Sequence, residues 1–451
     1  MSSPQMQLAT PHFLLGHLPY FNSDPLGFLS ECGASGRDVM TLRMAHKTLF
    51  LLREPEDVAR VLVTEHHQFI KPAWLRTASI SRLLGDGIVT SEGEIWRGQH
   101  NAYLPAFEVS RMPEYGDIIS SLTAETMESW TSGAAIDVQM EMTQLTLKVI
   151  GRLLFSSLTP KSDWPEEIAC DLNILLVHFS SRYRVYGMAP FPPSLAEMRA
   201  AKSLNASICR LICHYRETRP DPSSNTDKGT QPLLPMMPGY SLSDTGVRNT
   251  SFLSDQVKTI VAAGSESSSV AVSWALILLA QHPEISCKLF AELDTVLGAR
   301  APNLADLFYL PFTRAVVNET VRLFPPLWMT GREAIHACVI GNTKIPAGGQ
   351  IMTSQWLIHR LPGYFPNPDA FRPERWLNMD PRDIPKGAYF PFGAGPRVCM
   401  GKNFALMETS LILASICRKY RPELASQDPI VPWATVTLRP PLGVKLILHA
   451  R

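Results

Sequence analysis

The chain has 451 residues, of which 45% are hydrophobic and 18% are charged, and its formal net charge is +1. This length corresponds to one large domain or to two or three ordinary ones, and the apolar share is sufficient for a sizeable core. The balanced charge gives no general attraction to nucleic acid, so we expect no such partner. Eight cysteines scattered along the chain favour a reducing compartment over a disulfide framework.

Hydrophobic periodicity and turn residues predict the first elements in chain order. Residues 39–42 and 48–52 have the pattern of strands, and a helix is expected to open at Glu54. The long region 136–281 is mainly helical by the same criterion. A cluster of prolines near position 192 interrupts it, because proline cannot occupy a helix interior.

The second half of the chain combines loops, helices and short strands. Residues 219–243 are rich in Pro, Ser, Gly and Asp and predict a long exposed connector rather than a boundary between autonomous domains. A proline-rich stretch with little helix follows at 361–396, and short strands are expected near 434–438 and 444–448. We therefore predict a single α+β domain over residues 1–451, mainly helical with small sheets.

The N-terminal region contains only short apolar stretches, far below the ~20 residues that a spanning helix requires. It also lacks the pattern of a secretory signal. We expect a chain without a transmembrane segment and a cytoplasmic location. A membrane anchor that has been removed is the alternative that the sequence leaves open.

The most informative local pattern is Phe-Gly-Ala-Gly-Pro-Arg-Val-Cys-Met-Gly at 392–401, which is followed at once by a helical apolar pattern. The glycines and proline before Cys399 predict a tight turn. A helix start behind the sulfur would supply unpaired N–H groups that favour the thiolate. A free cysteine is more often simply buried, but a thiolate on a rigid loop can also be the axial ligand of a haem iron.

A second unusual pattern lies inside an apolar run that reaches Leu279. Gly264, Glu266 and Ser267 place a glycine, an acid and a hydroxyl in the middle of a predicted helix, where all three are poor choices for a core helix. From the residues alone, a solvent-facing polar stripe and a functional site are equally good interpretations.

Two further helical pairs have both structural and functional interpretations. Glu319 and Arg322 share a helix face that stops before a pair of prolines, and their apolar neighbours indicate burial. A buried pair needs additional partners, which Arg375 can supply. Trp96 and His100 also share a face, as in any amphipathic helix with an aromatic anchor.

Together these motifs resemble the cytochrome P-450 family. The loop meets every fixed position of the family's haem-ligand pattern, Phe-x-x-Gly-x-Arg-x-Cys-x-Gly, and Glu-x-x-Arg and Pro-Glu-Arg-Trp precede it in the family's order. The resemblance covers nearly the whole chain. It implies a P-450-type helical fold with small β-sheets, in which haem b lies between the oxygen-activation helix and the cysteine-ligand loop.

The resemblance also implies roles for individual residues. Cys399 would be the axial thiolate ligand of the iron. The oxygen-activation segment would comprise Ala263, Gly264, Glu266 and Ser267. The structural network that holds the ligand loop would comprise Glu319, Arg322 and Arg375. Further contacts with the cofactor are implied for Trp96, His100, Arg332, Arg397, Phe392, Gly393 and Gly401.

The implied activity is a monooxygenase that activates dioxygen and hydroxylates or epoxidises an apolar small molecule, such as a terpenoid, a fatty acid or another secondary-metabolite intermediate. Ser267 departs from the family's threonine: it keeps a hydroxyl for proton delivery but loses the methyl group that fixes the rotamer. Oxidative coupling, desaturation and a non-catalytic haem-binding sensor remain alternatives. Substrate contacts are implied at 74–90, 172–186, Ala263, 327–330 and 435–437.

Electrons would come from an external partner, either a ferredoxin with its reductase or a flavin reductase, because the chain has no room for a fused redox domain. The basic residues Arg397, Lys402, Arg418 and Lys419 could form a docking face for an acidic partner. A cluster of this size is more often a solvated surface.

Overall fold

The computed structural model describes residues 11–76, 80, 83–156, 163–186, 193–218, 232–240, 247–379 and 382–451. Its α-helices are α1 (Leu18–Ser23), α2 (Pro25–Ala34), α3 (Pro55–Ala59), α5 (Gly93–Tyr103), α6 (Met112–Glu128), α7 (Val138–Phe155), α8 (Trp164–Tyr186), α9 (Leu195–Thr218), α10 (Val247–Gln281), α11 (Pro283–Val296), α12 (Pro311–Leu323), α13 (Gln355–Ile358) and α14 (Lys402–Lys419).

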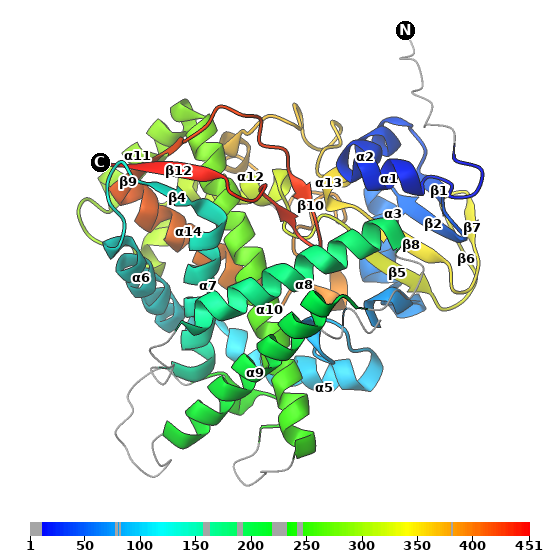
Figure 1. Cartoon of the computed structure of the whole chain (residues 1–451). Helices are drawn as coiled ribbons and strands as arrows, with labels where there is room; N and C mark the ends of the chain where they lie inside the picture. The colour runs from blue at the N-terminus through cyan, green and yellow to red at the C-terminus, as the bar shows by residue number, and fades with distance from the viewer. Residues whose placement is uncertain are drawn as a thin grey trace.

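Helix α10 runs through the middle of the molecule and packs most extensively against α7 (Figure 1). Its apolar side chains are buried on several sides, as expected for a helix surrounded by other elements. The segment Ser251–Gln281 is long and apolar enough to cross a membrane by length and composition, but 78% of its most apolar stretch is buried inside the protein. It therefore serves as a core helix here.

The strands form four small sheets. The largest has five strands in the order β1-β2-β8-β5-β3, in which β2 and β8 are parallel and the other neighbours antiparallel. A three-stranded sheet has the order β4-β12-β9, and β6-β7 and β10-β11 are two-stranded. The strands are β1 (Val39–Met44), β2 (Lys47–Leu52), β3 (Phe69–Ile70), β4 (Ala135–Asp137), β5 (Thr330–Ala334), β6 (Cys338–Ile340), β7 (Thr343–Ile345), β8 (Gln350–Thr353), β9 (Tyr420–Leu424), β10 (Trp433–Ala434), β11 (Leu438–Arg439) and β12 (Lys445–Ala450).

Two apolar cores hold these elements together. The larger is built from helices, with α10 and α14 at its centre. The smaller lies between the five-stranded sheet and helices α1 and α2, at the right of Figure 1. Helix termini are satisfied locally: the Asp137 side chain accepts a hydrogen bond from the Met140 N–H at the start of α7, and Glu292 accepts two from the first turn of α12.

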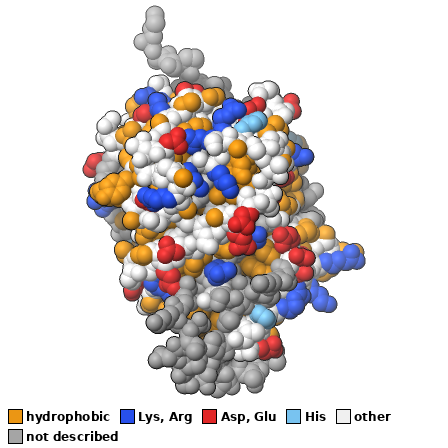
Figure 2. Space-filling view, turned by 90° about the vertical axis from the view of Figure 1, so that its left-hand side faces the viewer, with side chains coloured by type: hydrophobic (Ala, Val, Ile, Leu, Met, Phe, Trp, Pro, Cys, Tyr) orange, Lys and Arg blue, Asp and Glu red, His pale blue; other side chains and the backbone are white. Residues whose placement is uncertain are grey.

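The α+β fold class is confirmed, and so are the strands near 39–42, 48–52 and 444–448. The expected strand near 434–438 is instead a hairpin, in which the two-residue strands β10 and β11 pair with each other. All eight cysteines are free, which confirms that there is no disulfide framework. The face of the molecule in Figure 2 mixes acidic and basic side chains, in keeping with the near-zero net charge.

The prediction of an exposed connector at 219–243 is wrong for the part that the structure describes. Leu233, Leu234 and Met237 are 5% exposed or less and belong to the larger core. The Leu233 N–H also donates a hydrogen bond of 2.9 Å to the Leu153 carbonyl of α7. The apolar residues within this stretch are buried in the core even though its overall composition is typical of an exposed loop. Residues 219–231 and 241–243, and two of the prolines near 192, lie outside the described residues.

Candidate functional site

Cys399 ends a loop whose shape is set by its own backbone. The Gly393 N–H donates to the Phe390 carbonyl and the Cys399 N–H donates to the Phe392 carbonyl, each at 2.9 Å. Gly393 and Gly395 adopt left-handed φ values of 71° and 68°, which glycine alone adopts without strain. A Cβ on Gly395 would also lie only 1.9 Å from the Leu62 carbonyl oxygen. The glycines therefore allow the loop to fold tightly and to lie directly against the helical turn Arg60–Thr64.

Helix α14 begins at Lys402, three residues after the sulfur, as the sequence predicts. The Cys399 side chain is exposed, although protein groups surround it on several sides. The Gly401 N–H lowers the pKa of its thiol, as expected at a helix start, but desolvation by the surrounding protein raises that pKa by more. A bound cation would reverse this balance, since coordinated thiols are deprotonated.

Two members of the polar segment in α10 face open space. Ala263 and Ser267 are four residues apart, and both remain accessible in a stretch that is otherwise largely buried. The Ser267 hydroxyl donates a hydrogen bond of 2.8 Å to the Ala263 carbonyl. This bond holds the side chain in one rotamer, as the missing methyl group of threonine otherwise would.

Gly264 lies against helix α7. A Cβ on this residue would lie 2.7 Å from the Ile150 Cδ1 atom of α7. The glycine thus permits the close packing of α10 on α7.

Glu266 points toward a different element from its neighbour Ser267. Its carboxylate accepts hydrogen bonds from Arg439 Nη2 at 2.5 Å and Nε at 2.6 Å, and from the Thr437 hydroxyl at 2.6 Å. Arg439 also donates to the Asn173 side chain of α8 at 2.7 Å. Glu266 and Arg439 are both nearly buried. Sequence reasoning did not find Arg439, which lies 173 residues away and has no local motif.

Several cations gather beside the cysteine loop. The Arg397 guanidinium lies 3.6 Å from the centroid of the Trp96 ring and pairs with Glu92. Burial, together with the nearby charge of Arg397, lowers the pKa of Arg332 to about 10. Burial likewise lowers the pKa of Lys71 to about 7, again with a contribution from Arg397. Among the described residues, Glu92 is the carboxylate that faces these three cations.

The Trp96 and His100 rings on α5 are in tilted contact next to this cluster, with centroids 4.9 Å apart. The Lys71 ammonium group donates to the Ile88 and Ser91 carbonyls at 3.0 and 3.1 Å. The sequence contained no signal for Lys71, because a single lysine before a proline belongs to no pattern. The surplus of positive charge makes this cluster suitable for a ligand that carries carboxylates.

The residues present fit haem b. Cys399 would hold the iron as its single protein ligand. A haem-thiolate site requires one soft sulfur ligand, and the two propionates of haem would balance the cation cluster.

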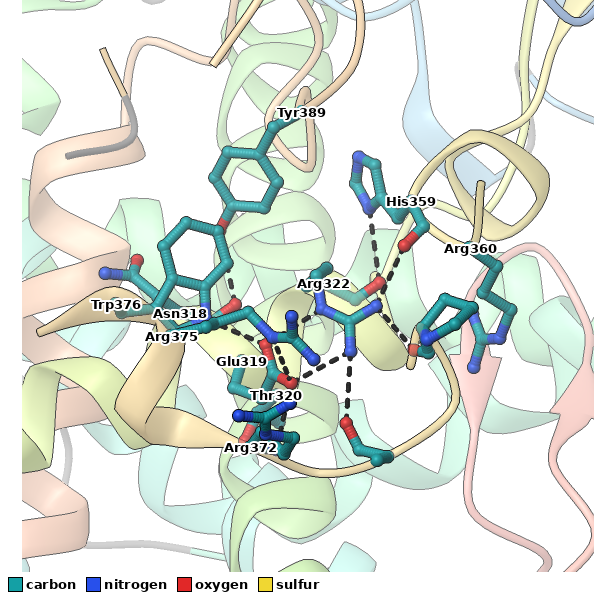
Figure 3. A network of polar contacts seen from close by, with 12 residues as sticks. Asn318, Glu319, Thr320, Arg322, His359, Arg360, Arg372, Arg375, Trp376 and Tyr389 are labelled. Carbon is teal, nitrogen blue, oxygen red and sulfur yellow. Dashed lines mark hydrogen bonds and ion pairs between the residues drawn. The ribbon is translucent and has the colours of Figure 1, made fainter. Parts of the chain in front are cut away.

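Glu319 and Arg322 form the centre of a buried network (Figure 3). Both are 0% exposed, and the Arg322 Nε and Nη2 atoms donate to the two carboxylate oxygens at 2.8 and 2.9 Å. Arg375 and the Trp376 indole donate to the same carboxylate at 2.9 and 2.8 Å. The remaining donors of Arg322 reach backbone carbonyls of His359, Pro368 and Ala370. The structure thus brings together the three residues expected to form this network.

Glu408 is a buried carboxyl group that sequence reasoning missed. It lies on α14, is 0% exposed, and faces Ser268 of α10. Burial raises its pKa to about 8, and the Ser268 hydroxyl offsets only part of that effect. At neutral pH this side chain is therefore mainly protonated in the folded protein.

The fold and these features define a haem-thiolate class of oxidoreductase. The chain belongs to the cytochrome P-450 family, whose model matches residues 6–448. It is 32% identical to cyclooctatin synthase of Streptomyces melanosporofaciens, over 90% of this chain and 88% of that protein. Cyclooctat-9-en-7-ol 5-monooxygenase of the same organism is also 32% identical, over 90% and 87%. Pentalenene oxygenase of Streptomyces avermitilis is 28% identical, over 97% and 96%.

Removing one partner of the buried pair should destabilise the protein strongly. Arg322→Leu leaves the Glu319 carboxylate buried with fewer partners, and we expect a loss of about 3–5 kcal/mol in the free energy of unfolding, measured with urea. The control is Arg97→Ala, which removes an exposed pair with the same spacing on α5 and should cost less than about 1 kcal/mol. Equal losses in the two variants would contradict the special importance of the buried network.

Glu408 should make stability depend on pH. Its pKa is raised from 4.5 in the unfolded chain to about 8 in the folded protein, so the folded state retains a proton that the unfolded state releases. Stability should therefore fall as pH rises from about 4.5 to 8, by at most about 5 kcal/mol. Glu408→Gln should remove this loss in urea titrations across that range. The control Glu94→Gln, whose 83% exposed side chain on α5 pairs with an arginine, should leave the pH profile unchanged.

Proposed function

We propose that the protein is a haem-thiolate monooxygenase that acts on an apolar small molecule of the terpenoid class. The observation that supports this most directly is the group of cations formed by Lys71, Arg332 and Arg397 next to the loop of Cys399. Positive charge at this depth is costly unless an anionic ligand balances it. The sulfur ligand and the carboxylate-binding cluster together match a haem.

When bound, the haem supplies the reductive activation of dioxygen that an oxygenase requires. Cys399 would hold the iron and donate electron density to it. Arg332, Arg397 and Lys71 would bind the carboxylates, and the Arg397 guanidinium lies over the Trp96 ring. The His100 ring is tilted against the Trp96 ring on the same helix.

Ser267 is suited to hold a proton at the open face of α10. Its hydroxyl donates to the Ala263 carbonyl at 2.8 Å and can accept a second hydrogen bond from water at the same time. The Glu266 carboxylate accepts hydrogen bonds from Arg439 and Thr437. It is therefore the counter-charge of Arg439 and does not contact Ser267 directly. Proton transfer to Ser267 then proceeds through water, and Arg439 keeps the neighbouring carboxylate in place.

The proposed substrate class rests on the names of the similar proteins, which are cyclooctatin synthase, cyclooctat-9-en-7-ol 5-monooxygenase and pentalenene oxygenase.

The remaining partners are dioxygen and an external electron donor, either a ferredoxin with its reductase or a flavin reductase, and we propose a cytoplasmic location. Arg397 is unsuited to the basic docking face expected from the sequence, because Glu92 and Trp96 engage its guanidinium. Lys402 and Lys419 are the better candidates for such a face, although Lys419 lies over the Tyr420 ring.

The ligand assignment is tested by the spectrum of the reduced protein under carbon monoxide. We expect a Soret band strongly red-shifted from that of a histidine-ligated haem, because a thiolate is the axial ligand. Cys399→Ser should abolish the band. Cys417→Ser, which changes a buried cysteine on α14, should retain it. A wild-type protein that folds but binds no haem would refute the proposed function.

The role of Ser267 is tested by the fate of the reducing equivalents. With a surrogate reductase and a terpenoid substrate, Ser267→Ala should lower product formation by about 10²-fold, the low end for a positioned proton donor. The electrons should appear as hydrogen peroxide, with haem content unchanged. The control is Ser265→Ala, which loses the same kind of bond to the preceding turn but is fully buried. Unchanged coupling in the first variant would exclude the role.

A further inference from the structure

His359 lies one residue after α13 with its ring fully buried. The ring Nε2 atom is 3.0 Å from the backbone nitrogen of Phe390, and the Nδ1 atom is 3.2 Å from the backbone carbonyl oxygen of Arg322. Figure 3 shows the ring directed toward Arg322 within the network around Glu319. The imidazole therefore contacts the backbone of Arg322, one residue of the buried ion pair, and the backbone at the start of the cysteine loop.

These two contacts define the protonation of the ring. A backbone N–H can only donate, so Nε2 must be the unprotonated acceptor for Phe390. A carbonyl oxygen can only accept, so Nδ1 must carry the proton that is donated to Arg322. The charged ring would lose the acceptor, and the other tautomer would lose both bonds. Burial supports the neutral form, because it lowers the pKa of His359 to about 3, with Arg322 and Arg360 nearby.

Hydrogen bonds connect this histidine to the sulfur through the backbone. The ring accepts a hydrogen bond from the Phe390 N–H, and the carbonyl of the same residue accepts one from the Gly393 N–H at 2.9 Å. The Phe392 carbonyl accepts one from the Cys399 N–H, also at 2.9 Å. On the other side, the Arg322 guanidinium donates to the His359 carbonyl at 2.8 Å. Arg322 and His359 are thus joined in both directions, by a guanidinium–carbonyl bond and by a ring–carbonyl bond.

Aromatic side chains limit the motion of the ring. Its centroid is 5.2 Å from that of Tyr389, 5.4 Å from that of Phe390 and 6.4 Å from that of Phe365. Tyr389 also donates a hydrogen bond of 3.2 Å to the Asn318 carbonyl, but it does not contact the cysteine loop through a polar group among the described contacts. Tyr389 therefore shares the packing of His359 without sharing its connection to Phe390.

We propose that His359 is a positioning residue for the iron ligand, which transmits the fixed geometry of the Glu319–Arg322 pair to the backbone of the Cys399 loop. This inference rests on the proposed function, because it concerns the ligating position of the sulfur. Without the ring, the Phe390 N–H and the Arg322 carbonyl would be buried without partners. The loop would then lose the hydrogen bond that ties its first residues to α12.

Two conservative variants distinguish the two hydrogen bonds that the ring makes. In His359→Gln, the side-chain carbonyl reaches about as far as Nε2 and can still accept from Phe390. In His359→Asn, the shorter amide can donate to Arg322 but does not reach Phe390. Tyr389→Phe is the matched control, since it removes one buried hydrogen bond from the same aromatic group. All variants are tested in the full chain loaded with haem.

The readouts are the ferrous–carbon monoxide spectrum and the reduction potential of the iron. We expect the asparagine variant to lose most of the thiolate band and to shift the potential, whereas the glutamine variant and Tyr389→Phe should keep most of both. Equal behaviour of the asparagine and glutamine variants, or loss of the band in Tyr389→Phe, would overturn the proposal and leave only a packing role for the histidine.

Hydrogen exchange at the Phe390 amide gives a readout that does not depend on haem. The amide should exchange at least about 10-fold faster in His359→Asn than in His359→Gln or the wild type, because it loses its acceptor. An unchanged exchange rate would overturn the proposal in haem-free and haem-loaded protein alike. A wild type without a thiolate band would instead refute the proposed function, while the exchange experiment would still decide whether His359 holds Phe390.

Discussion

The buried ion pair between Glu319 and Arg322 is the interaction on which the arrangement of the site depends. Two opposite charges at 0% exposure are stable only when every donor and acceptor is used, and this pair meets that condition with side chains and backbone carbonyls from distant parts of the chain. The pair thereby determines where the segments after α12 and α13 lie. Because the connection through His359 continues to Phe390, the same requirement reaches the loop that presents Cys399.

The other buried charges are balanced in different ways, and the difference separates structural from ligand-binding positions. Glu266 has Arg439 as a complete counter-charge inside the fold, so this pair can stay in place without a ligand. Lys71, Arg332 and Arg397 share one carboxylate, Glu92. Their positive charge exceeds the negative charge of that carboxylate, so an anionic ligand would stabilise them. The carboxylates of a haem would satisfy the same physical requirement that a salt bridge satisfies elsewhere.

Helix α10 combines these functions because successive residues on a helix point in different directions, about 100° apart. Gly264 allows close packing on α7, Glu266 reaches β11, Ser267 faces open space, and Ser268 faces Glu408 on α14. Four of these five consecutive positions thus face three neighbouring elements and one open space. A polar segment in an apolar helix is not one polar stripe here, and its residues cannot be assigned a common role.

Local sequence determined the features that depend on neighbours along the chain: the helix from Pro311 to Leu323 that ends before two prolines, the tight glycine turn before Cys399, and the pairing of Glu319 with Arg322. Periodicity and turn chemistry act over a few residues and can be read directly. Only the tertiary structure decided the partners that come from distant elements. Three such contacts depend on how helices and sheets pack: the pairing of Glu266 with Arg439, the approach of Lys71 to Arg397, and the position of His359 between two backbone segments. A single charged or polar residue carries no local sign of the group that it will contact. The surroundings of the exposed Cys399 thiol were decided in the same way, because the protein groups that raise its pKa by desolvation come from the packed molecule.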